Sequence, residues 1–295
     1  TVAPVATVVG ELTSSAGTTT VSDAELNHLT ALNDGAIVLQ SLAGNIEVPN
    51  VISSGSGAVL LSSAAALTLT GDLDSGSGSV SMLAEDAITL GLGASISSST
   101  SGSVLIESAN GAFTMSGNAS ITAVNAVLGI HADDDLTLGV TTADAVSLIS
   151  NDGGIRRAAT VGTTIAANRL RIDAAGSIGT LERAFTTSVD LMSMTGSSVH
   201  LWSIGSTTIG TVGLTFDRLL SDLSTETVED PAQSGVVSTS GGLIDIRTIA
   251  GDLTLTATAG VISADAAGNV LLTIDGDFDA GADVTSISGT LTLNI

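Results

Sequence analysis

Residues 57–71 read GAVLLSSAAALTLTG, and the same pattern returns in residues 78–91, 102–117 and 125–139 as GSVSMLAEDAITLG, GSVLIESANGAFTMSG and NAVLGIHADDDLTLG. Each copy holds a short apolar run, a polar cluster and a second run in which apolar and hydroxyl side chains alternate. The first runs start 21, 24 and 23 residues apart, at Val59, Val80, Val104 and Val127. A repeat of this length with two or three short strands is typical of one coil of a β-solenoid.

The runs themselves predict how such a coil buries its apolar side chains. In a strand such as Leu136-Thr137-Leu138 the two leucines point to one face and the threonine to the other. A weaker third run follows in some copies, at residues 94–96 and 119–121. One coil cannot bury its own apolar face, but stacked coils about 4.8 Å apart share a continuous core. The sequence therefore predicts an all-β fold, a parallel and right-handed β-helix with coils of about 19–25 residues.

Roughly a dozen such coils would form a rod about 60 Å long. An antiparallel β-sandwich is the alternative fold. It requires longer strands joined by hairpin turns such as Asn-Gly, and Asn110-Gly111 is the one such pair in the chain.

The repeat divides the chain into four parts. Residues 35–212 form one β-helix block, and residues 243–295 continue it with further coils. Residues 213–242 contain Asp217, Asp222, Glu226, Glu229, Asp230 and Pro231, and we interpret them as an irregular acidic insertion, a loop or helical excursion between the blocks.

Residues 1–34 are expected to form an N-terminal segment with a short capping helix. Ser22 and Glu25 have the spacing of a capping box. Leu26, Leu29 and Leu32 follow at helical spacing.

Composition agrees with a narrow, layered core. Hydrophobic residues make up 43% of the 295 residues and the mean hydropathy is +0.51, whereas aromatic residues make up 2%. This apolar, β-branched content argues against disorder. The chain has no Cys and therefore neither disulfides nor thiolate metal sites.

Charge limits the partners of the chain. The formal net charge is -23, and all seven basic residues are arginines. A polyanion of this kind is a poor ligand for nucleic acid and for anionic lipid, so we expect neither nucleic-acid binding nor membrane insertion. Five arginines cluster at Arg156, Arg157, Arg169, Arg171 and Arg183, where we expect ion pairs with acidic residues of the rod.

The Leu-Thr-Leu runs, the Gly-x-Val runs and Gly251-Asp252-Leu253-Thr254-Leu255 resemble repeats of filamentous-haemagglutinin-like adhesins and other large repetitive bacterial surface proteins. The resemblance covers most of residues 35–295. It implies a right-handed β-helix on an extracellular, cell-surface protein, acting as an adhesin stalk or a self-assembling filament subunit. No binding motif of these families carries over residue by residue.

Two other functions are compatible with a β-helix. A polysaccharide-binding or polysaccharide-cleaving β-helix is the first alternative, but Asp133-Asp134-Asp135 lies in a turn, Lys is absent and aromatic residues are few, so we expect no enzyme. An ice-binding solenoid is the second. It would use outward threonines, and the candidates are Thr68, Thr89, Thr114, Thr137 and Thr254.

One segment suggests a metal. Asp275, Asp277 and Asp279 alternate along the chain with Asp283 beyond them, an oxygen-rich spacing that suits Ca²⁺, although the EF-hand pattern fails at Ala280 and Ser286. We treat these four aspartates as weak calcium candidates. His28, His131 and His200 form no recognisable triad, and Trp202 is a candidate for sugar stacking or for packing.

The ends of the chain lead to a last expectation. The chain starts at Thr1 without a visible signal peptide, and it stops in the strand-like run of residues 290–295. We expect a processed form or a fragment whose open β-helix end joins further coils or a second copy, and we expect glycans or a cell surface as further partners.

Overall fold

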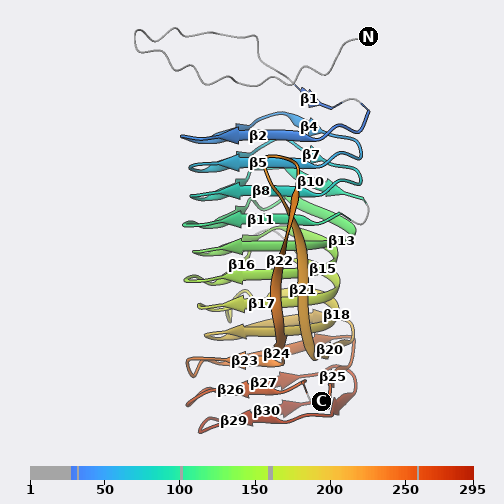
Figure 1. Ribbon diagram of the computed structural model, residues 1–295. Helices are drawn as coiled ribbons and strands as arrows, with labels where there is room; N and C mark the ends of the chain where they lie inside the picture. The colour runs from blue at the N-terminus through green and yellow to red at the C-terminus, as the bar shows by residue number, and fades with distance from the viewer. Residues whose placement is uncertain (1–27, 32, 100–101, 159–161, 258) are drawn as a thin grey trace.

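The computed structural model describes residues 28–31, 33–99, 102–158, 162–257 and 259–295. Within them the chain forms a parallel β-solenoid of about 11 turns, a rod of stacked coils (Figure 1). At a strand spacing of about 4.8 Å, this number of turns corresponds to a length of about 50 Å. The predicted fold class is confirmed, and parallel ladders exclude the β-sandwich.

Each coil of the first block contributes strands to three faces. The first face contains β1 (His28–Thr30), β4 (Val51–Ser53), β7 (Leu73–Asp74) and β10 (Ser95–Ser98). The second contains β2 (Ile37–Ser41), β5 (Val59–Ser63), β8 (Val80–Ala84) and β11 (Val104–Ser108). The third contains β3 (Ile46–Val48), β6 (Leu67–Leu69), β9 (Ile88–Leu90), β12 (Phe113–Met115), β14 (Leu136–Leu138) and β16 (Ile155–Arg157).

From the middle of the rod, single long strands replace the separate strands of the first two faces. These are β13 (Ser120–Ala132), β15 (Val140–Ser150), β17 (Ile165–Ala174) and β18 (Phe185–Gly196). Each pairs in parallel with the next.

The remaining coils again have three short strands each. One ladder contains β19 (Val199–Ile204), β24 (Ile244–Ile249), β27 (Val270–Thr273) and β30 (Leu291–Asn294). The second contains β20 (Thr207–Ile209), β25 (Leu253–Leu255) and β28 (Phe278–Ala280), and the third contains β23 (Val236–Ser238), β26 (Ile262–Ala264) and β29 (Val284–Ser286). The long strand β18 pairs with three short strands, β19, β20 and β23.

The core consists of aliphatic columns that run through the stack. One column follows the register Leu61, Met82, Ile106, Ile130, Leu148, Ile172 and Met194. Each of these side chains is fully buried. Because every coil repeats the same inward positions, the core needs few aromatic residues.

One part of the repeat alignment was wrong by a residue. Val59, Val80 and Val104 share a column, but the next member is Leu128 and not Val127. The register of β13 shifts between Ala123 and Val127, where Asn125 has a φ of 63°. Residues 124–126 of β13 lie opposite Asp144 alone in β15, so this irregularity adds two residues, which the spacing alone cannot show.

Glycines at one corner allow the coils to stack closely. A Cβ at Gly78 would lie 2.1 Å from the carbonyl oxygen of Gly57, and a Cβ at Gly57 would lie 2.2 Å from that of Gly35. A side chain at either position would force the coils apart, which explains the glycine that precedes the first run in three of the four copies, at Gly57, Gly78 and Gly102.

The two ends of the chain were expected to carry a capping helix and an open strand, respectively. Residues 20–27 of the expected capping helix lie outside the described residues, and Leu29 lies in β1, which pairs with β4. At the other end, β30 pairs with β27 and its side chains Leu291 and Leu293 are 50% and 45% exposed.

Candidate functional site: the strap and the face beneath it

The one departure from the coil pattern among the described residues is an antiparallel hairpin. Its strands are β21 (Thr211–Leu219) and β22 (Thr225–Ser234), and we call residues 211–234 the strap. In Figure 1 the strap runs along the rod, across the strands between β8 and β18. The expected irregular insertion at 213–242 is thus wrong in its local structure, because most of it is a regular hairpin.

The sequence of the strap explains its form. Val212, Leu214 and Phe216 alternate along β21 and are buried, while the residues between them are exposed. Asp222 closes the turn by accepting hydrogen bonds from the backbone N–H and the hydroxyl of Ser224 at 3.0 and 2.6 Å. The acidic residues that suggested a loop lie on the solvent side of the hairpin, apart from Asp230, which is 3% exposed.

The strap covers the outward side chains of β8, β11, β13, β15, β17 and β18, which we call the covered face. Leu105 and Ala145 point away from the core of the rod, yet both are fully buried. They pack with Val212, Leu214 and Phe216 in a second hydrophobic cluster, separate from the rod core.

A glycine accommodates the largest strap side chain. A Cβ at Gly129 would lie 3.0 Å from a ring carbon of Phe216. The ring of Phe216 also meets the edge of His131, with centroids 5.9 Å apart and planes at 83°. The strap and the covered face are therefore matched in shape.

Charged groups connect the tip half of the strap to the rod. Arg218 donates to Glu107 from Nε at 2.7 Å and from Nη2 at 2.6 Å, a bidentate ion pair. Arg218 also donates to Glu226 at 3.2 Å. His131 lies between two carboxylates, with Nε2 at 3.0 Å from Asp230 and Nδ1 at 3.5 Å from Glu107.

Backbone groups of the strap are bound by rod side chains as well. Ser103 Oγ accepts from the N–H of Asp217 at 3.1 Å, and Ser81 Oγ accepts from the N–H of Leu219 at 2.9 Å. Near the base, Arg171 Nε donates to the carbonyl of Pro231 at 3.0 Å. Gln233 Nε2 donates to the carbonyl of Ile172 at 2.8 Å.

The geometry shifts the pKa values of these groups. Burial lowers the pKa of His131, but its hydrogen bonds with Asp230 and Glu107 outweigh burial and raise the pKa to about 9. Burial raises the pKa values of Glu107 and Asp230, but hydrogen bonds from His131, joined at Glu107 by Arg218, lower both overall. The hydrogen bond to Glu107 is the largest cause that raises the pKa of Arg218. The network is therefore charged at neutral pH.

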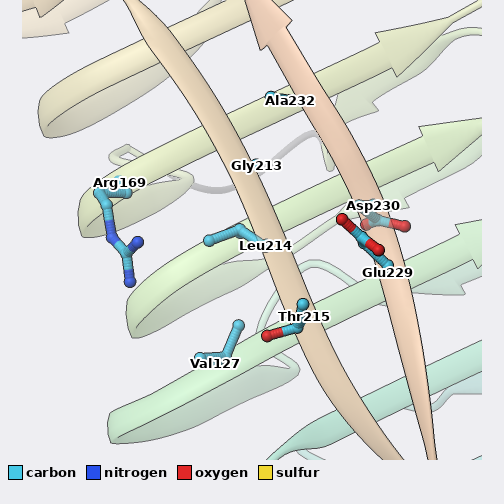
Figure 2. Close-up of a pocket in the computed structure, with 8 residues that line it drawn as sticks. All are labelled: Val127, Arg169, Gly213, Leu214, Thr215, Glu229, Asp230 and Ala232. Carbon is cyan, nitrogen blue, oxygen red and sulfur yellow. The ribbon is translucent and has the colours of Figure 1, made fainter.

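A pocket of about 370 Å³ lies between the strap and the rod (Figure 2). Its lining combines a cation, carboxylates, a hydroxyl and apolar groups: Val127, Arg169, Gly213, Leu214, Thr215, Glu229, Asp230 and Ala232. Arg169 is half exposed and faces Asp144, 3.6 Å away. This mixture suits a small polar ligand with an apolar side.

The four calcium candidates are all exposed and lie in one coil, the coil of β27, β28 and β29. Asp275 and Asp277 flank the turn between β27 and β28, Asp279 lies in β28, and Asp283 precedes β29. Asp275 accepts from the N–H of Ala250 at 3.1 Å. In the part of the chain that the structure describes, no three His, Asp or Glu side chains are grouped closely enough to hold a metal ion.

Three members of the arginine cluster form ion pairs within the rod, as expected. Arg156 pairs with Asp135, Arg169 with Asp144 and Arg171 with Asp173. The pair of Arg171 and Asp173 lies at the edge of the covered face, which the sequence did not indicate.

Trp202 and His200 point outward from β19, beside Arg247 and Asp245 of β24. The guanidinium of Arg247 lies 5.9 Å from the centre of the Trp202 ring. Burial lowers the pKa of His200 and raises that of Asp245. Trp202 thus packs against a neighbouring coil.

The candidate ice-binding threonines align in part. Thr68, Thr89, Thr114 and Thr137 form one ladder on the third face, between Glu47 and Arg156. Thr254 lies elsewhere, between Thr208 and Asp279. The threonines therefore form one column bounded by charges.

Comparison with models of known protein families, with curated proteins and with solved structures finds no match for this chain. The described residues also contain no helix of the length and apolarity that crossing a lipid bilayer requires.

Proposed function

We propose that this chain is an extracellular structural or adhesive segment of a surface protein, an adhesin stalk or a filament subunit. The observation that carries the proposal is the rod itself, in which the same aliphatic columns continue from coil to coil. Each coil adds length and further outward side chains without changing the core, which is the property that a stalk requires.

Surface chemistry supports the same role. A net charge of -23 keeps a long rod soluble and separate from other anionic surfaces. The resemblance of the repeats to those of filamentous-haemagglutinin-like adhesins points in the same direction. Half-exposed Leu291 and Leu293 on β30 suit a further coil or a second copy as the neighbour of that strand.

Polysaccharide binding is the second candidate function, and the pocket beside the strap favours it. Arg169, Thr215 and Glu229 offer donors and acceptors around the apolar side chain of Leu214, a combination that suits sugar hydroxyls. Cleavage would require two carboxyl groups on either side of one glycosidic bond. Asp230 is hydrogen-bonded to His131, so its carboxylate already has a partner.

The proposed location is tested on the producing cells. Antibodies against the purified chain should decorate the surface of intact cells in immunogold microscopy. Label confined to the cell interior, seen only after permeabilisation, would refute the surface role.

The proposed form is tested by negative-stain microscopy of the purified chain with and without millimolar Ca²⁺. Fibres would identify a filament subunit, and discrete short rods would identify a stalk segment. Fibres that form only with Ca²⁺ would support Asp275, Asp277, Asp279 and Asp283 as a calcium site. A glycan array, with Arg169→Ala as the matched variant, tests the second candidate, since pocket binding should be lost in that variant.

A further inference from the structure

The pocket beside the strap separates its charges. Arg169 of β17 and Val127 of β13 line it from the rod, and both strands of the hairpin line it from the strap. In Figure 2 the guanidinium of Arg169 lies on one side and the carboxylates of Glu229 and Asp230 lie on the other. The side chains of Leu214 and Thr215 lie between them, so a ligand in this pocket meets a cation, an apolar surface and carboxylates in turn.

Two of these three charged groups already have partners within the chain. Arg169 lies 3.6 Å from Asp144, and Asp230 lies 3.0 Å from Nε2 of His131. The carboxylate of Glu229 is different, because it has neither an ion pair nor a hydrogen bond within the described part of the chain. Glu229 is also exposed. The pocket therefore presents one negative charge that a ligand is free to neutralise.

The charge of the whole molecule favours a cationic ligand as well. The formal net charge is -23, and the strap adds the exposed carboxylates of Asp217, Asp222 and Glu226 near the pocket. A field of this sign attracts cations and repels anions before contact is made. An acidic sugar would be repelled by the field and by Glu229, whereas a neutral sugar would leave Glu229 without a partner.

The remaining lining residues indicate what kind of cation fits. The hydroxyl of Thr215 both donates and accepts, and the guanidinium of Arg169 has more N–H donors than one contact at 3.6 Å uses. These groups suit the hydroxyls of a sugar, and Leu214 suits the C–H face of its ring. A lysine side chain would neutralise Glu229 but would make no use of the groups that bind hydroxyls.

We propose that this pocket binds a sugar with a free amino group, its ammonium at Glu229 and its hydroxyls at Arg169 and Thr215. The inference rests on the polysaccharide binding proposed above as the second function, and it names the ligand class as a polymer of deacetylated amino sugars. The volume of about 370 Å³ lies in the lower part of the range of about 300–1,000 Å³ for small-molecule sites. The pocket therefore holds a short stretch of the polymer, which continues into solvent past the exposed Glu229.

Three oligosaccharides of equal length test the ligand class. Oligomers of glucosamine, N-acetylglucosamine and galacturonate are titrated into the full chain by calorimetry at pH 6, where the amine is charged. The glucosamine oligomer should bind most tightly and the galacturonate oligomer should not bind. High salt should weaken the glucosamine complex more than the N-acetylglucosamine complex, because only the first contains an exposed ion pair.

Three variants locate the contact. Glu229→Gln should weaken glucosamine binding about fivefold, which is the effect of an exposed ion pair, and should leave N-acetylglucosamine binding unchanged. Asp217→Asn is the matched control, because it removes the same charge from the same strap outside the pocket and should keep the preference for the amine. Arg169→Ala should weaken the binding of both oligomers alike, because both offer it hydroxyls.

The possible failures of this inference and of the proposed function differ. Equal binding of the glucosamine and N-acetylglucosamine oligomers, lost in Arg169→Ala, would overturn the inference and support polysaccharide binding in the pocket. Tighter binding of an oligolysine of equal charge would overturn the assignment to a sugar. No binding of any oligosaccharide would overturn both the inference and the second candidate function, and cell labelling tests the surface role independently.

Discussion

His131 is a buried cation between Asp230 and Glu107, and its charge depends on the strap being closed. Its pKa of about 9 lies above the ordinary value of 6.5. A raised pKa means that the stabilisation is fully present below pH 6.5 and is lost as the pH rises through about 9. The shift corresponds to about 3 kcal/mol.

We therefore predict that the strap loosens progressively between about pH 6.5 and 9, and that His131→Gln removes this pH dependence. Fluorophenylalanine labelling gives ¹⁹F resonances in which Phe216 reports strap closure and the other three phenylalanines report the rod. The matched variant His200→Gln should keep the transition, because the pKa of His200 is lowered and it is neutral throughout this range. An unchanged transition in His131→Gln would contradict the assignment.

Two arginines provide a second test at this scale. Arg218→Met should weaken strap closure by about 3 kcal/mol, because the partly buried Glu107 loses its bidentate partner and keeps the longer contact with His131. Adding Glu107→Gln should recover part of that loss. Urea titration of the Phe216 resonance measures both.

Arg156→Met is the control for that experiment. The side chains of Arg156 and Asp135 are 51% and 45% exposed, so the loss should stay below about 1 kcal/mol. Equal losses for Arg156→Met and Arg218→Met would show that the pair beneath the strap is no stronger than a surface pair.

At the scale of single elements, the coils could be predicted from the sequence and the strap could not. Every coil strand repeats positions that its neighbours also carry, as at Val59 and Val80, so the pattern is visible many times. The strap occurs once in the chain. Its acidic residues favoured the interpretation as a loop, so the alternation of Val212, Leu214 and Phe216 was not recognised as a strand. That alternation, followed by the turn at Asp222, was the signal for a hairpin.

The covered face could not be predicted from the sequence for a different reason. His131 and Glu107 lie 24 residues apart, and Asp230 lies 99 residues beyond His131. Their approach depends on the coil register and on the direction of the strap, and neither follows from local spacing. In the sequence, Leu105 likewise has no feature that distinguishes it from other outward residues, because the strap that covers it lies far from it along the chain.

Phe216 and Phe113 allow the two hydrophobic clusters to be tested separately. Phe216→Ala should cost about 3–5 kcal/mol in strap closure, seen as faster hydrogen exchange in residues 211–234 with the coils unchanged. Phe113 is buried in the rod core, so Phe113→Ala should instead speed exchange in the neighbouring coils. Loss of coil protection in Phe216→Ala would mean that the strap and rod unfold as one unit.

At the scale of the whole molecule, the strap adds a long-range constraint to a stack whose coils otherwise contact only their neighbours. Its contacts extend from Ser81 on β8 to Leu191 on β18. The number of coils between those points must match the length of the hairpin.

Inserting coils tests that match. A second copy of residues 128–145 should displace Glu107 and Ser81 by one coil, about 4.8 Å, and release the tip half of the strap. A second copy of residues 59–79 lies outside the span and should lengthen the rod by the same amount with the strap closed. Small-angle scattering gives the length, and protease sensitivity at the strap tip gives its state. Equal resistance of the strap tip to protease in both insertion variants would contradict the match between the length of the hairpin and the number of coils beneath it.

The span of the strap has a consequence for inheritance. Solenoid genes gain and lose whole repeats by unequal recombination, and most such events leave a foldable stack. In this chain, duplications before Ser81 or after the base of the strap preserve every contact, whereas those between them separate His131, Glu107 and their partners. Descendants of this sequence should therefore differ in length at their two ends while keeping the same number of repeats in the middle.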